Sequence, residues 1–132
     1  MKTLQEIMAP HKVEIPAHLE AQAEVPVLTG LQRQGDVLVI PMKPGLIDGL
    51  EPIPAEGVAV VRGEAGGNTH LLVGSGKVAL RANGQSMGSL VVAEGETAYL
   101  LHPEHGAQGI GAGTYRIHRQ REMADELRLV AD

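Results

Sequence analysis

The chain has 132 residues, of which 43% are hydrophobic and 20% charged, which is ordinary usage for one globular domain and argues against extensive disorder. Aromatic residues make up only 2%, so the chain lacks the stacking platforms of single-stranded nucleic-acid binders. The net charge of −5 offers no overall basic surface to nucleic acid, and the absence of Cys excludes disulfides, thiolate catalysis and Cys-based zinc sites.

Neither end of the sequence carries a targeting or anchoring motif. Residues 1–10 lack the apolar core of a secretory signal, and no stretch approaches the roughly 18–20 apolar residues of a membrane span. The last six residues contain no lipidation or retention motif. We therefore expect a cytoplasmic protein that does not interact with membranes.

Residues 1–34 differ from the rest of the chain because Pro10, Pro16 and Pro26 interrupt any long helix. Single helical turns are expected over 3–8 and 17–23. The pattern predicts an N-terminal arm that lies along the domain or across a partner chain, and the second case implies a homo-oligomer. A partly ordered leader is the alternative interpretation.

From Gly35 onward, short apolar runs alternate with Gly-rich turns, which is typical of an all-β domain over 35–132. The segment from Val73 to Lys77 has the composition of a tight hairpin turn. We expect Gly106, Gly109 and the glycines after them to break the chain before the last strand. About seven or eight short strands are expected in total, enough for a small cupin-like barrel or a β-sandwich. The clearest predicted strands are 36–41, 57–64, 69–73, 77–81, 89–93, 97–101 and 114–121.

The last predicted strand carries several basic residues without a clean apolar face. Acidic residues follow from Glu122 onward, which weakens a nucleic-acid interpretation. We interpret this segment as a solvated edge strand whose charges block pairing with other strands. The basic group consists of Arg116, His118, Arg119 and Arg121.

Histidine is the residue type that carries the functional argument, because its neutral ring is the commonest metal ligand. His11 and His18 lie in the arm and are expected at the surface. His102 and His105 are three residues apart, so they face one point only if the chain turns between them. Pro103 and the following Gly favour such a turn. A polar loop cap with two solvated histidines is the alternative.

His70 follows a Gly pair and opens a predicted strand. By alternation it shares a face with Leu72, so it points inward if that face lines the interior. The alternative is a histidine satisfied by backbone or water. If the three rings converge, they can hold one divalent metal ion, and a position left open on the ion permits polarisation of a small-molecule ligand. The predicted metal ligands are His70, His102, His105 and Glu122, with Gln120 or Glu104 as other candidates for the last position.

Two segments resemble the cupin superfamily of small β-barrels: Gly35-Asp-Val-Leu-Val-Ile-Pro41 and Gly95-Glu-Thr-Ala-Tyr-Leu-Leu-His-Pro-Glu-His105. Both contain a Gly-Asp or Gly-Glu turn, an apolar strand and then Pro. The region from Gly35 to Asp132 also resembles a family of small bacterial β-proteins with Gly-His-x-His, His-x-Glu-His and Gln-Arg-Glu motifs. The first His of that pattern is Asn68 here, which replaces a strong nitrogen donor by a weak one.

Two functions follow as expectations. The first is a small-ligand or divalent-metal-binding protein, and the second is a non-catalytic assembly protein whose arm mediates oligomerisation. The distances among the rings of His70, His102 and His105 distinguish them. No residue is assigned a catalytic role.

Overall fold

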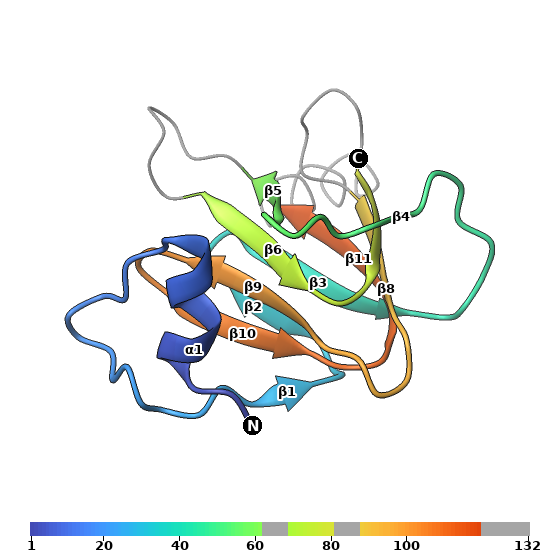
Figure 1. Cartoon of the computed structure of the whole chain (residues 1–132). Coiled ribbons are helices and arrows are strands. Elements are labelled where there is room, and N and C mark those ends of the chain that lie inside the picture. The colour runs from blue at the N-terminus through green and yellow to red at the C-terminus, as the bar shows by residue number, and fades with distance from the viewer. Residues whose placement is uncertain (62–68, 81–87, 120–132) are drawn as a thin grey trace, which may run out of the picture.

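The computed structural model describes residues 1–61, 69–80 and 88–119 (Figure 1). Asn68, Gln120 and Glu122 therefore lie outside the described residues, as do the outer ends of three predicted strands. No helix within the described ranges is long and apolar enough to cross a membrane. Two short helical pieces open the chain, α1 (Leu4–Met8) and η1 (Ala9–His11). Eleven described strands follow: β1 (Val27–Leu28), β2 (Gln32–Gln34), β3 (Val37–Met42), β4 (Glu51–Pro52), β5 (Val58–Val61), β6 (His70–Gly74), β7 (Lys77–Leu80), β8 (Gly88–Val92), β9 (Ala98–His102), β10 (Gly106–Ile110) and β11 (Gly113–Arg119).

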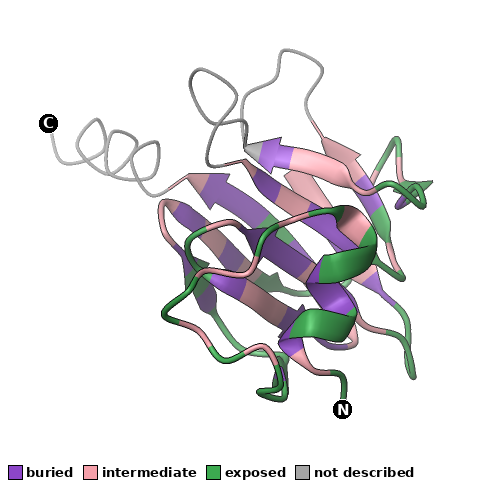
Figure 2. Ribbon diagram, turned by 60° about the vertical axis from the view of Figure 1, so that its left-hand side comes forward, coloured by how far each residue is buried: buried purple, intermediate pink, exposed green. Residues whose placement is uncertain are grey.

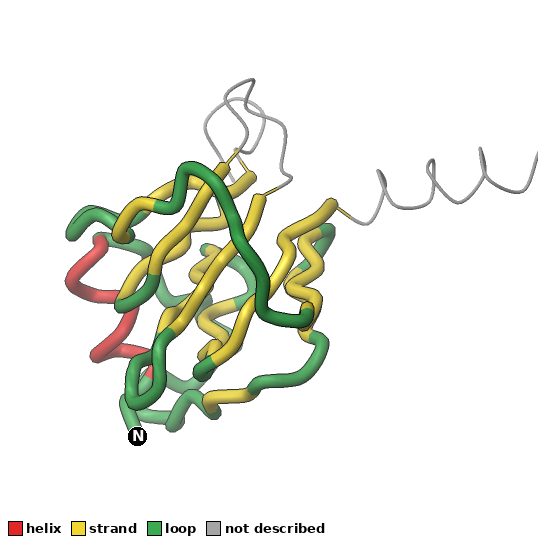
Figure 3. The backbone as a smooth tube through the Cα atoms, turned by 90° about the vertical axis from the view of Figure 1, so that its right-hand side faces the viewer, coloured by secondary structure: helices red, strands yellow, loops and turns green. Residues whose placement is uncertain are grey.

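These strands form two sheets that pack face to face (Figures 1 and 3). The first sheet has the order β1-β10-β9-β6-β5, and the second has the order β2-β3-β11-β8-β7-β4. The apolar side chains between them come from alternate positions of each strand, such as Val39, Leu72, Leu90 and Leu100. The all-β prediction is confirmed, and of its two architectures the described strands form the sandwich.

The N-terminal arm lies along its own domain, where α1 covers the outer face of the first sheet (Figure 2). Thr3 and Glu6 form a capping box that begins this helix, because each side chain accepts a hydrogen bond from the other residue's backbone N–H. The apolar side of the helix buries Ile7 and Met8 against a cluster that includes Val73 and Leu101. Residues 17–23 form turns rather than a helix, and residues 27–34 contribute β1 and β2 to the sheets.

The prediction that the last strand is a solvated edge strand is wrong. Strand β11 lies inside the second sheet and pairs with both β3 and β8. Tyr115 and Ile117 point into the core, whereas Arg116 points outward and is exposed. The two inward-facing positions, 115 and 117, are therefore apolar. The charged side chain on the opposite face did not prevent β11 from pairing with a strand on each side.

The expected break at Gly106–Ile110 is a strand, β10, that pairs with β9 and, in parallel, with β1. Gly109 permits the close approach of β1. A Cβ at this position would lie 2.7 Å from the Pro26 carbonyl oxygen and 3.0 Å from the Val27 Cα. Glycine here is a packing requirement rather than a chain break.

Candidate functional site

His70, His102 and His105 come together at one end of the sandwich. The centroids of the His70 and His102 rings are 4.3 Å apart, and those of His102 and His105 are 4.5 Å apart. Strands β6 and β9 are antiparallel neighbours, so the first residue of β6 lies beside the last residue of β9 (Figure 1). The turn at 103–105 then brings the His105 ring to the same place, which is one of the two alternatives that the sequence left open.

His70 points between the sheets with Leu72, as alternation predicted, and is only 5% exposed. Its Nδ1 lies 2.9 Å from Oε1 of Gln34, while Nε2 of Gln34 donates to the Leu100 carbonyl oxygen at 2.9 Å. An amide oxygen can only accept, so Nδ1 of His70 is the donor. The other ring nitrogen, Nε2, consequently keeps its lone pair.

The electrostatic surroundings keep His70 neutral. Burial is the main cause that lowers its pKa from 6.5 to about 4, and the neighbouring His102 and His105 add to the effect. The negative charge of Asp36 raises the pKa of His70, but by less than burial lowers it. At neutral pH the His70 ring is therefore an uncharged base with one nitrogen held by Gln34.

His102 is oriented by the turn that follows it. Its Nδ1 accepts hydrogen bonds from the backbone N–H groups of Glu104, at 3.0 Å, and His105, at 3.2 Å. The neutral His102 ring therefore carries its hydrogen on Nε2. The loop-cap interpretation is correct in that His102 caps the turn, although the residue is only 3% exposed and is not solvated.

The third ring, His105, is exposed and lies beside the two-residue turn between β2 and β3. A Cβ on Gly35 would be 3.1 Å from His105 Nε2 and 3.4 Å from His70 Cε1. These two imidazoles thus lie under the same point of the turn. Gly35 also has a φ of +55°, which favours glycine, so both the conformation and the space select this residue.

Gln34 is the site residue that the sequence analysis missed. It is 1% exposed and reaches from the edge strand of the second sheet to two strands of the first sheet. Gln32, two residues earlier on β2, also reaches the first sheet, where it donates to the Gly109 carbonyl oxygen at 3.0 Å. The spacing Gln32-Arg33-Gln34 before a Gly-Asp turn places both amides on one face, and this was the available signal.

Of the other candidate ligands, the structure describes only Glu104. Glu104 is exposed on the turn, and Glu122 and Gln120 lie outside the described residues. Asp36 Oδ2 is 3.4 Å from Arg119 Nε at the partly exposed rim. Among the residues that the structure describes, no three His, Cys, Asp or Glu side chains already surround a point suited to a metal ion.

The fold and the cluster define a small two-sheet β-sandwich with three histidines at one end. A family model described as a domain of unknown function (DUF8820) matches residues 33–120, more than half of the chain, and the chain belongs to this family. The match includes Gln34 and all three clustered histidines. No curated protein and no solved structure matches the chain. The resemblance to cupins stays a prediction.

Proposed function

We propose that the histidine cluster binds a divalent metal ion of the class that imidazole favours, such as Zn²⁺, Ni²⁺ or Cu²⁺. His70 and His105 are the first two ligands, and His102 is the third. The observation that carries the proposal is the convergence of three imidazoles from β6, β9 and the turn after β9. A purely structural plug at this end of the sandwich would be served as well by apolar side chains, which need no hydrogen-bond partners.

His70 has the surroundings of a metal ligand. Ligating histidines usually donate their second ring N–H to an oxygen atom, which fixes the orientation of the ring. Gln34 Oε1 provides that oxygen for Nδ1, and the Leu100 carbonyl oxygen fixes Gln34 in turn. Because the pKa of His70 is lowered to about 4, protons do not compete for Nε2 at neutral pH.

His102 joins the ion only after a local adjustment. Its Nδ1 now accepts two backbone N–H groups, and binding through Nε2 requires the ring hydrogen to move to Nδ1. Both of these hydrogen bonds are then lost, so the turn at 103–105 has to rearrange as the ion binds. With Zn–N distances of about 2.1 Å, two imidazoles on a tetrahedral ion have centroids about 5 Å apart. The observed 4.3 and 4.5 Å separations require only a small spreading of the rings. Glu104 and His105 are exposed, so the turn can supply this movement.

The test is a calorimetric titration of untagged, metal-free protein with ZnCl₂ and NiCl₂, with MgCl₂ as a hard-cation comparison. We expect one ion per chain and a Kd about tenfold or more weaker in His70→Ala and His105→Ala, since each removes one ligand. His18→Ala is the matched control, because His18 is exposed in the arm. The proposal fails if neither ion binds, or if His18→Ala weakens binding as much as the cluster variants do.

Self-assembly is the second candidate function, and exposed apolar residues near one sheet edge favour it. The apolar side of α1 packs on its own chain, so the arm helix is already occupied. Val27, Leu28 and Leu31, however, are exposed at or just after the edge strand β1. Light scattering of the wild type and Leu28→Asp tests this candidate. A dimer that the substitution dissociates supports it, and a monomeric wild type contradicts it.

A further inference from the structure

The turn at 103–105 is in direct contact with the N-terminal arm. His102 and Gly106 are cross-strand partners on β9 and β10, and this pair closes the turn. A Cβ on Gly106 would lie 2.9 Å from Leu19 Cδ1 and 3.4 Å from Leu4 Cδ1, and both leucines belong to the arm. The arm therefore packs on the residue that ends the turn of the histidine cluster.

Side-chain packing holds the arm on the domain. The hydrogen bonds that residues 1–25 make with other described residues stay within the arm, such as the one from the Leu4 N–H to the Ala23 carbonyl oxygen at 2.9 Å. The apolar side of α1 packs on Val73 and Leu101 of the first sheet (Figure 2). Such a segment can leave its site by local opening, without unpairing any strand.

The turn has to differ between the two states of the histidine cluster. In the structure, Nδ1 of His102 accepts the backbone N–H groups of Glu104 and His105, and Leu19 packs beside this form of the turn. When His102 binds an ion through Nε2, Nδ1 carries the hydrogen and both hydrogen bonds are lost. Because the contact with Leu19 is close, the rearranged turn and the docked arm compete for the same space.

We propose that ion binding at the histidine cluster and docking of the arm oppose each other. This inference rests on the metal site proposed above, and it identifies the turn as the element that both events bias. The docked arm stabilises the turn that His102 caps, whereas the bound ion stabilises the rearranged turn. By linkage, zinc weakens docking of the arm by the same factor by which an undocked arm raises the affinity for zinc.

Hydrogen exchange of the full chain, with and without saturating ZnCl₂, measures the arm directly. The amides of Leu4 and Val25 donate to carbonyl oxygens within the arm, so they exchange faster once the arm undocks. We expect zinc to raise their exchange rates about fivefold or more, the lower end of typical coupling between two sites. Amides of β11 should not exchange faster, because a bound ion stabilises the folded chain as a whole.

Calorimetry of the same sample separates the two ways in which this experiment can fail. If zinc binds and the amides of Leu4 and Val25 exchange no faster than before, the coupling is refuted and the metal site stands. If zinc does not bind, the metal site and the coupling are both wrong.

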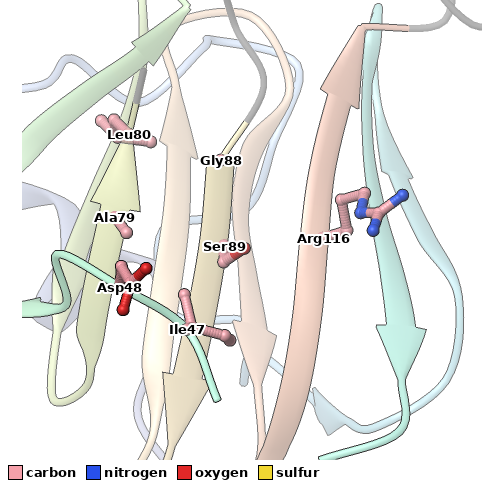
Figure 4. Close-up of a pocket in the computed structure, with 7 residues that line it drawn as sticks. All are labelled: Ile47, Asp48, Ala79, Leu80, Gly88, Ser89 and Arg116. Carbon is pink, nitrogen blue, oxygen red and sulfur yellow. The ribbon is translucent and has the colours of Figure 1, made fainter. Parts of the chain in front are cut away.

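The reverse effect is measured with Leu19→Ala, which removes the closer of the two leucine contacts with Gly106. It should bind zinc about threefold or more tightly than the wild type, since Leu4 keeps the second contact. Ile47→Ala is the matched control. Ile47 is also a half-buried aliphatic residue, but it lies on the loop after β3 and lines a cavity with Ser89 of the second sheet (Figure 4). Unchanged or weaker binding in Leu19→Ala, or an equal gain in Ile47→Ala, contradicts the coupling.

Discussion

Replacing Gln34 by Ala tests whether this amide holds the histidine cluster in place. The substitution removes the acceptor of His70 Nδ1 and the donor to the Leu100 carbonyl oxygen, which are both buried. It also removes one side-chain link between the edge strand β2 and the first sheet, although the hydrogen bond from Gln32 to the Gly109 carbonyl oxygen remains.

The cost follows from the groups left behind. A buried donor or acceptor without a partner costs about 1–3 kcal/mol, so two such groups give a loss of about 2–6 kcal/mol in the free energy of unfolding. For a domain of this size, each kcal/mol lowers Tm by roughly 3–5 °C. The variant should therefore melt about 6 °C or more below the wild type.

Chemical denaturation and calorimetry of metal-free protein measure the loss. The matched control is Gln22→Ala, which also removes an amide hydrogen bond, to Gln5 Oε1 at 2.7 Å, but on the exposed surface. We expect the control to change the free energy of unfolding by less than about 0.5 kcal/mol. If Gln34→Ala costs no more than Gln22→Ala, the role assigned to Gln34 is refuted.

Three further predictions address the rest of the molecule. The pKa of His70 is 6.5 in the unfolded chain and about 4 in the folded protein, so the unfolded chain binds more protons between these two pH values. The free energy of unfolding should therefore decrease as the pH drops from 6.5 to 4. Denaturation curves of metal-free protein at both ends of this range should show a loss up to about 3 kcal/mol larger in the wild type than in His70→Gln, and equal losses would contradict the assignment. Met8→Ala should cost about 2–5 kcal/mol because Met8, in α1 of the arm, is fully buried against the first sheet, whereas Met42→Ala, at an exposed site, should cost far less in the same assay. Gly109→Ala should destabilise the protein by about 1–3 kcal/mol by forcing β1 away, while Gly30→Ala, where a Cβ meets nothing within 4 Å, should be close to neutral; equal effects on Tm would argue against the close-packing role of Gly109.

Local sequence patterns indicated how the histidines can face, although they left other arrangements open. Alternation in β6 put His70 with Leu72, and the Pro-containing turn allowed His102 and His105 to meet. These inferences held because they depend on the strand period and on turn chemistry, which are properties of neighbouring residues.

The features that the sequence analysis missed depend on contacts between distant segments. Gly109 was interpreted as a chain break because the proximity of Pro26 and Val27 is visible only in the folded protein. Strand β11 was assigned to an edge from its charges, although pairing partners are set by the order of strands in the sheet. Gln34 had no recognisable function until the Leu100 carbonyl oxygen and His70 were placed beside it.

Anomalous diffraction from crystals grown with zinc tests the central proposal most directly. We predict a single strong peak at the cluster, about 2.0–2.2 Å from Nε2 of His70 and from a ring nitrogen of His105. A map without a peak at these rings, with zinc bound only at His11 or His18, would contradict the account.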